Sequence, residues 1–318
     1  FYSVAQAANG KTLLADLPSQ YGLYGELLAP WFKLVGLTVF TFTATMTALV
    51  LLGNGALFLA MRRLTRGMLM PVLWLVTTAH LSLWGLHYID PKDWNLADPY
   101  YQYTPIRFVF PALGVAVFLW FTRRPTDRRA AAMGVCCGLA LPWNVDSGVA
   151  VTGAVFVTLV ATHALRLFEP TPSGSARALC RARLRESTLR LFRTGSGAVA
   201  ALLATLGFVV GCLYLKSGGR LHLEWLTQSQ HVFYLAGIAM TRMPDLPHLW
   251  GAVAGIYLLG AAVGATAIRR GGRDPLWDML LFLASLGMGL FVYYQGRSED
   301  TNLVTASWPA VLTLFLLT

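Results

Sequence analysis

The chain of 318 residues is 56% hydrophobic and only 13% charged, whereas a soluble domain is about a quarter charged. Its apolar residues form repeated runs, so the composition indicates a polytopic membrane protein and excludes an ordinary soluble globular domain. The net charge of +10 does not indicate a nucleic-acid partner, because the basic residues lie in short clusters between apolar runs, where membrane topology explains them.

Residues 1–36 precede the first long apolar run. Apolar residues recur at helical spacing from Ser19 to Val35, while Glu26 and Lys33 fall on other faces of the same helix. We therefore predict a helix that lies in the membrane interface rather than across the membrane. The alternative is an ordinary helix end that leads directly into the first span.

Nine apolar runs follow, at 37–61, 68–87, 106–122, 130–142, 147–167, 196–215, 249–268, 275–294 and 303–318. A helix needs roughly 20 residues to cross the hydrocarbon core of a bilayer. By that measure 130–142 is short, and it could form one re-entrant hairpin with its successor. We predict an all-α, polytopic transmembrane helical bundle of about nine spans. A single domain would cover 1–318, with the bundle at 37–318.

The basic residues predict which side of the membrane each connection faces. The connections at 62–66, 123–129, 166–193 and 269–273 hold 17 of the 25 Lys and Arg residues, and they share one side if every run crosses. By the positive-inside rule that side is the cytoplasm. Ten of the fifteen acids lie in the segments predicted to face outward, which are 1–27, 88–105, 143–146, 216–248 and 295–302. We expect the arginine-rich 166–193 segment to form a basic amphipathic helix on anionic inner-leaflet lipid.

Five polar segments on the predicted outer side carry residues capable of chemistry. They are Asp16–Gly22, Asp90–Tyr103, Pro142–Gly148, Lys216–His248 and Tyr293–Asn302. Each has a structural alternative, because Asp, Asn and Gly are ordinary turn residues and aromatic residues are common in the membrane interface. For Asn144, for Asp146 and for the last segment, a simple loop is as good an interpretation as a functional site.

The apolar runs hold few ionisable residues, of which the main ones are His80, His163 and Asp278. Ion-coupled transporters place acids or bases inside the membrane because the ion pathway needs them. The scarcity of such residues argues against an ion-coupled transporter. The polar residues lie instead at the outer ends of the apolar runs, where a water-soluble acceptor and the head of a lipid could meet.

Three of the polar segments resemble outer loops of bacterial multi-spanning glycosyltransferases of the GT-C class. Gly10–Gly22 (GKTLLADLPSQYG), followed by the interfacial helix, resembles the end of their first outer loop, so residues 1–36 would form that end. Tyr293–Ser298, with Asn302 close behind, is similar to a late outer-loop motif, and Asn144–Gly148 fits their mid-chain outer turn. The resemblance spans most of the chain, although the motifs are short.

The resemblance implies a glycosyltransferase of the bacterial inner membrane with its site facing outward. It would move a sugar from a polyprenyl-phosphate donor to an extracytoplasmic glycan, lipid or protein acceptor, among membrane lipids. An acid would deprotonate the acceptor hydroxyl, and a guanidinium would stabilise the departing phosphate. The implied residues are Arg297 for the phosphate, Gln20, Tyr21, Asn144, Asp146, Ser298 and Asn302 for sugar or acceptor hydroxyls, and Asp16 and Asp146 as candidate acids. A divalent metal would be compatible with such a site, but no residue spacing calls for one.

The chain departs from the GT-C class at its start. That class places its catalytic acid early in the first outer loop, whereas Asp16 lies downstream of that position. The chain begins at Phe1 without Met and stops within an apolar run at Thr318. We therefore expect a fragment of a longer chain at both ends, in which the base would precede Phe1.

Two other functions compete with the glycosyltransferase. One is a transporter of lipids or polysaccharide precursors, and the other is a non-catalytic membrane scaffold. A transporter should have a continuous polar path across the bilayer. An enzyme should instead have one outer cavity that is closed below by apolar helices.

Overall fold

The computed structural model describes the chain except for residues 66, 85–102, 169–175, 237–240 and 299. Most of the polar segment Asp90–Tyr103 therefore lies outside the described residues. Within the described residues the protein is helical and contains no strand, which confirms the predicted all-α class. In chain order the helices are α1 (Tyr2–Ala8), α2 (Tyr24–Val35), α3 (Val39–Leu64), α4 (Leu69–Trp84), α5 (Thr104–Arg123), α6 (Asp127–Trp143), α7 (Val145–Leu167), α8 (Ala176–Lys216), α9 (Trp225–Ala236), α10 (Leu249–Arg269), α11 (Pro275–Gly296) and α12 (Asp300–Leu317).

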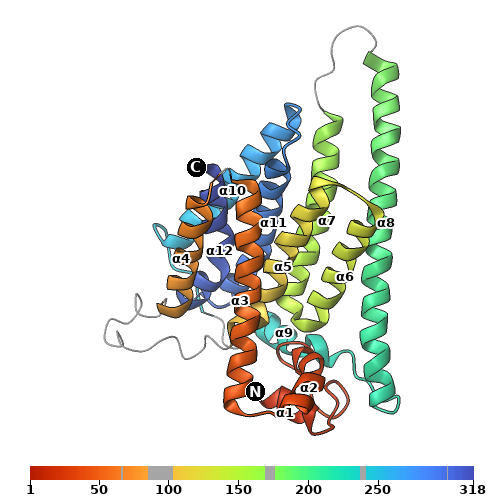
Figure 1. Cartoon of the computed structure of the whole chain (residues 1–318), viewed down its shortest axis with the longest axis vertical. Coiled ribbons are helices and arrows are strands. Elements are labelled where there is room, and N and C mark those ends of the chain that lie inside the picture. The colour runs from red at the N-terminus through yellow and green to blue at the C-terminus, as the bar shows by residue number, and fades with distance from the viewer. Residues whose placement is uncertain (66, 85–102, 169–175, 237–240, 299) are drawn as a thin grey trace.

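The long helices form one bundle. Helices α3 to α8 and α10 to α12 run along the long axis of the molecule in alternating directions (Figure 1). Helices α1, α2 and α9 lie at one end of the bundle, which we call the loop end. The arginine-rich ends of α3, α5, α7 and α10 lie at the opposite end, which we call the arginine end. The basic connections thus share one end of the fold, as the sequence predicted.

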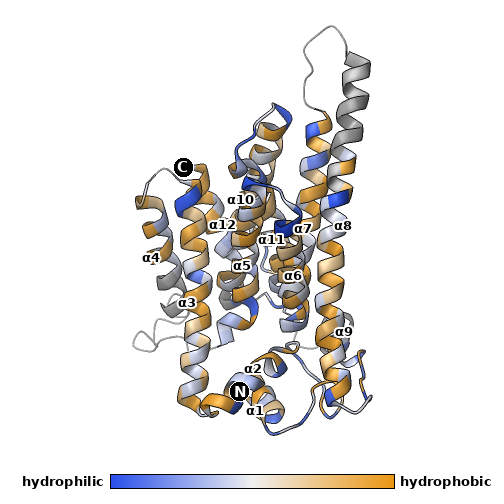
Figure 2. Ribbon diagram, turned by 45° about the vertical axis from the view of Figure 1, so that its right-hand side comes forward, coloured by the Kyte–Doolittle hydropathy of each residue, from blue (hydrophilic) through white to orange (hydrophobic). Residues whose placement is uncertain are grey.

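Among the described residues, six helices are long and apolar enough to cross a membrane, namely α3, α5, α7, the Phe192–Lys216 part of α8, α10 and α11. Apolar residues run along the outer faces of α3 and α8 (Figure 2), where Leu51, Leu203 and Phe208 are exposed. This pattern indicates an all-α membrane bundle. Helices α4 and α12 have shorter apolar stretches within the described residues, and α6 has 17 residues. The nine-span count therefore stays a prediction.

Helix α11 lies at the centre of the bundle, where it contacts α5, α7, α10 and α12. Phe282 of α11 stacks on Phe118 of α5 with ring centroids 4.4 Å apart. A side chain at Gly287 would lie 2.2 Å from the ring of Tyr257 in α10, so glycine is what allows that ring to pack against α11. These aromatic contacts fill the middle of the bundle with apolar groups.

Helix α8 is continuous over 41 residues. Its apolar part packs closely on α6 through small residues, because a side chain at Gly134 would meet the backbone of Ala198. The arginine-rich part continues the same helix past the ends of its neighbours (Figure 1). The basic segment is helical from Ala176, as predicted, but it is continuous with the apolar part of α8 rather than a helix of its own. No proline divides the two parts, and alanine, leucine and arginine all favour helix, so the helix continues where the composition changes.

The predicted interfacial helix is present as α2 at the loop end, but it starts at Tyr24 rather than at Ser19. The residues before it form a turn in which the Ser19 hydroxyl donates to the Gly22 carbonyl. Phe32 of α2 is buried, whereas Trp31 and Leu34 are 49% and 83% exposed. One face of α2 therefore packs on the bundle, and the other presents large apolar side chains outward, as an interfacial helix would.

Candidate functional site

A cavity of about 720 Å³ lies between α5, α7, α10, α11 and α12, with one residue each of α3 and α4 completing its wall. It begins at the loop end, where Arg107 of α5 and Asp146 of α7 line it. It extends along α7 to Val157, about 16 Å from Asp146 at the helical rise of 1.5 Å per residue. The site is a long, mostly apolar chamber with its charged residues at one end.

Arg107 is held between two aromatic rings in the first turn of α5. Its guanidinium carbon lies 5.1 Å from the ring centroid of Tyr21 and 4.1 Å from that of Tyr293. Such contacts orient a cation without using its N–H donors. The Nη2 atom is 3.9 Å from Asp146 Oδ2, which is too long for a hydrogen bond, and the buried Nε has no hydrogen-bond partner. The guanidinium therefore keeps hydrogen-bonding capacity for an anion.

The turn between α6 and α7 brings two helix N-termini together. Trp143 Nε1 donates to the carbonyl of Ile106 at 3.1 Å, which ties this turn to the first turn of α5. Asn144 caps α7, because its Oδ1 accepts the N–H and the hydroxyl of Ser147 at 3.0 and 2.9 Å. First-turn N–H groups carry partial positive charge. The first turns of α5 and α7 thus both favour an anion at the charged end of the cavity.

The Gln20-Tyr21-Gly22 segment packs on the same turn. Asn144 Nδ2 donates to the Tyr21 carbonyl at 3.2 Å. Gly22 has φ +87, and a side chain there would lie 2.6 Å from the Trp143 carbonyl oxygen. Only glycine tolerates both that backbone conformation and that contact. The close approach is what places the Tyr21 ring over Arg107.

Of the residues predicted in the Asp16–Gly22 and Pro142–Gly148 segments, some lie at the cavity and others do not. Asp146 lines the cavity, and Tyr21 contacts Arg107 beside it. Asn144 is fully buried at 0% exposure, and its side chain orders the turn, as its structural interpretation predicted. Gln20 is exposed and does not line the cavity.

Asp16, the other candidate acid, lies away from the cavity lining. Its carboxylate accepts the Thr12 N–H at 2.8 Å and is 3.8 Å from Arg220 Nη2. Nearby, Glu26 accepts from Lys216 Nζ at 2.7 Å. These contacts fix the loop before α2 to the end of α8. Asp16 is therefore a residue that orders this loop.

The segment from Tyr293 to Asn302 reaches the cavity through Tyr293. Arg297 does not line the cavity. Its backbone forms an isolated bridge with Thr241, its carbonyl accepts from Asn302 Nδ2 at 3.0 Å, and its buried Nε has no hydrogen-bond partner. Ser298 is buried and donates to a carbonyl one turn earlier in α11 at 3.1 Å. Ser298 and Asn302 therefore stabilise the connection between α11 and α12.

Arg107 was not among the residues selected from the sequence. The signal that could have found it is an arginine just inside an apolar run, since a charge in such a position needs a partner or a function. It lies one residue into the predicted span 106–122, so its charge is easily attributed to the membrane boundary. Only the fold brings it beside Tyr21, Asp146 and Tyr293.

Among the described residues no group of three His, Cys, Asp or Glu side chains is placed to hold a metal ion. The chemistry that the arrangement supports is recognition of an anionic head by Arg107 and of an apolar chain by the cavity wall.

No family model, no curated protein and no solved structure matches the chain. The site is therefore interpreted from its own geometry.

Proposed function

We propose that the protein is a membrane glycosyltransferase that moves a sugar from a polyprenyl-phosphate donor to an acceptor outside the bacterial inner membrane. The observation that carries this proposal is the position of Arg107 at the charged end of a long apolar cavity. A phosphate-linked isoprenoid matches this distribution of charge, because it has an anionic head at one end of a long apolar chain. The helix N-termini beside Arg107 add to the preference for an anion.

Arg107 holds the donor phosphate in this proposal, and the cavity along α7 and α10 takes the isoprenoid chain. The donor is a phosphodiester with one negative charge, and the leaving lipid phosphate gains a second charge as its bond to the sugar breaks. A guanidinium already in place stabilises that growing charge, and one such contact typically contributes about 10²–10³ in rate. Tyr21 and Tyr293 keep the guanidinium oriented through their rings.

Asp146 is the carboxylate that lines the charged end of the cavity, and we assign it as the base. It takes the proton of the acceptor hydroxyl, whose oxygen forms a bond to the anomeric carbon of the sugar. The bond between that carbon and the phosphate oxygen breaks at the same time, and the lipid phosphate leaves with the electron pair. The sequence predicted Asp146 as a candidate acid, and its place in the cavity supports that role.

Transport of a lipid or polysaccharide precursor is the competing function. A transporter needs a polar path through the bundle. Toward the arginine end of the bundle, however, Phe118 and Phe282 are stacked, and Met279 and Leu280 are fully buried at 0% exposure. A cavity closed by packed apolar helices supports an enzyme over a transporter.

The proposal can be tested with the full-length protein in vesicles that contain a polyprenyl phosphate carrying a radiolabelled sugar. We expect the label to leave the lipid fraction and to enter the acceptor. Asp146→Asn should slow this transfer by about 10²–10⁴, the usual contribution of a general base. Ser285→Ala removes a hydroxyl from the same cavity, about 12 Å deeper than Tyr293 along α11, and should leave the rate unchanged. A label that stays on the lipid but crosses the bilayer would contradict the proposal and indicate a transporter.

A further inference from the structure

The two sides of the cavity have different linings. Val149 and Val157 of α7 and Leu258 of α10 form an apolar side, and they are 56%, 56% and 65% exposed, so this side faces the surroundings of the bundle. The opposite side, which we call the amide side, consists of Asn54 of α3, Thr78 of α4, Phe108 of α5 and Trp308 of α12. It contains an amide, a hydroxyl and two aromatic rings.

Helix contacts place Asn54 close to the level of Arg107. A side chain at Gly53, the residue before Asn54, would lie 2.7 Å from the ring of Phe108. Phe108 directly follows Arg107 in α5, so the two residues differ by about 1.5 Å along the helix axis. The amide of Asn54 therefore lies near the charged end of the cavity rather than deep in its apolar part.

The contact between α4 and α12 places Thr78 at the same level as Trp308. These helices run in opposite directions, and Thr318 Oγ1 lies 3.9 Å from Met70 Sδ. Thr78 is eight residues after Met70, and Ala310 is eight residues before Thr318, so Thr78 and Ala310 lie at the same height in the bundle. Ala310 is about half a helical turn from Trp308. The Trp308 ring packs edge-on against Phe108 with centroids 5.6 Å apart. Asn54, Thr78 and Trp308 thus belong to one region of the cavity wall.

The polar groups of the amide side have capacity for a ligand. Asn54 Nδ2 donates to the Val50 carbonyl at 3.0 Å, and within the described part of the chain the side chain makes no other hydrogen bond. Thr78 Oγ1 donates to the Trp74 carbonyl at 2.9 Å, so its oxygen can still accept. An isoprenoid chain here would bury the Asn54 amide against hydrocarbon, which is costly because its carbonyl oxygen would stay without a hydrogen bond.

We infer that the amide side is the carbohydrate subsite of the cavity and that it binds the sugar of the donor. This inference rests on the proposed function. Asn54 and Thr78 hydrogen-bond to sugar hydroxyls, while the C–H face of the sugar ring packs on Trp308. The donor then lies across the cavity, with its phosphate at Arg107, its sugar toward α3 and α4, and its isoprenoid chain on the apolar side.

The test compares a sugar-free probe, farnesyl methyl phosphate, with two sugar-bearing probes, farnesyl phosphate carrying glucose or mannose. All three are phosphodiesters with one negative charge, so the comparison isolates the sugar. Dissociation constants are measured on the full-length protein in detergent. Wild type should bind the better of the two sugar-bearing lipids more tightly than farnesyl methyl phosphate. Asn54→Leu and Thr78→Val keep side-chain volume but remove polar atoms. Each should weaken binding of that sugar-bearing lipid by about tenfold, the usual loss when one buried hydrogen bond is left unmade.

Binding of farnesyl methyl phosphate distinguishes the outcomes. It should be unchanged in both variants, and this also shows that each variant is folded. Thr122→Val is the matched control, because it removes a hydroxyl that donates to the Leu119 carbonyl at 3.1 Å away from the cavity lining, and it should change neither affinity. Equal losses for both probes, or no loss for the sugar-bearing lipid, would overturn the subsite. Failure of the folded wild-type protein to bind either probe would instead reject the proposed function, on which the subsite depends.

Discussion

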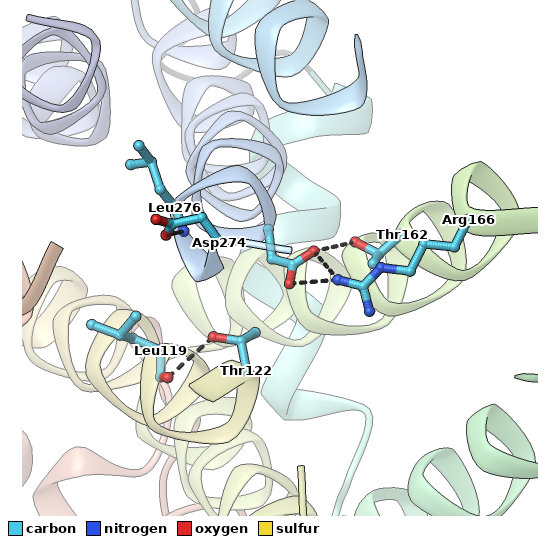
Figure 3. Close-up of polar contacts among 7 residues, drawn as sticks. Leu119, Thr122, Thr162, Arg166, Asp274 and Leu276 are labelled. Carbon is cyan, nitrogen blue, oxygen red and sulfur yellow. Dashed lines mark hydrogen bonds and ion pairs between the residues drawn. The ribbon is translucent and has the colours of Figure 1, made fainter. Parts of the chain in front are cut away.

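Helix α7 contributes one residue to an arginine–aspartate pair at each of its ends, and the two pairs are built differently. At the arginine end, Arg166 Nη2 lies 3.2 and 3.1 Å from the two carboxylate oxygens of Asp278, and Thr162 donates to the same carboxylate at 3.2 Å. Figure 3 shows Thr162 and Arg166 pointing from α7 toward this group on α11. At the loop end, Nη2 of Arg107 is 3.9 Å from Oδ2 of Asp146.

The difference lies in what surrounds each pair. Both arginines have a buried Nε without a hydrogen-bond partner, so that feature does not separate them. The Asp278 side chain is 9% exposed and lies on the central helix α11. The side chains of Arg107 and Asp146 are 21% and 19% exposed, and both line the cavity. A closely bonded pair joins two helices, whereas the Arg107 guanidinium on the cavity wall keeps hydrogen-bonding capacity for a ligand.

The largest expected effect of breaking a pair is on catalysis at the loop end. Arg107→Ala should lower the rate of sugar transfer by about 10²–10³, because in the proposed reaction it removes the cation that stabilises the leaving phosphate. Arg107→Lys keeps the charge but loses the planar pair of donors, so its rate should lie between those of wild type and Arg107→Ala. Initial rates with the full-length protein, normalised to folded protein, provide the measurement. Equal rate losses in Arg107→Ala and Arg166→Ala would remove the distinction between the two pairs.

The next effect is on stability at the arginine end. Arg166→Ala leaves the largely buried Asp278 carboxylate without its cation. Loss of one partner from a fully buried pair costs about 3–5 kcal/mol. Arg166 is 34% exposed, so we expect a smaller cost of about 2 kcal/mol, or an apparent Tm lower by about 3 °C.

The control for this stability effect is the loop-end pair. Arg107→Ala should change the apparent Tm by less than about 2 °C, because the site it leaves is partly open to the cavity. Both melting curves are recorded on purified protein in the same detergent. A larger loss of stability in Arg107→Ala than in Arg166→Ala would show that the loop-end pair is the one that holds the helices together.

The sequence predicted the parts of the fold that depend on local pattern. Long apolar runs identified the bundle helices, and the arginine clusters predicted which connections share an end, because both depend on the composition of one segment at a time. Asn144 also had the correct structural interpretation from its turn chemistry. The length of α8 was mispredicted, because a change from basic to apolar residues does not by itself end a helix.

The site was harder to predict because it depends on which helices become neighbours. Arg107 pairs with Asp146 since α5 lies beside α7, and Arg166 pairs with Asp278 since α7 lies beside α11. Neither adjacency can be read from the spacing of residues along one segment. Asp16 and Asp146 both stand in polar segments of the sequence, and only the fold shows that Asp146 lines the cavity whereas Asp16 contacts Thr12 and Arg220.

The smallest expected effect is that of replacing Arg297. The resemblance implied Arg297 as the residue that binds the phosphate, whereas the structure favours Arg107. Arg297 contributes to the α11–α12 connection through its backbone, which bridges to Thr241 and accepts from Asn302. Arg297→Ala leaves these backbone contacts in place, and the side chain does not line the cavity. We therefore expect sugar transfer within about threefold of wild type, as for a substitution outside the site. The same assay as for Arg107→Ala applies, with both variants in one membrane preparation. A hundredfold loss in Arg297→Ala, together with a mild effect of Arg107→Ala, would assign the phosphate to Arg297 and move the catalytic site from the cavity to the α11–α12 connection.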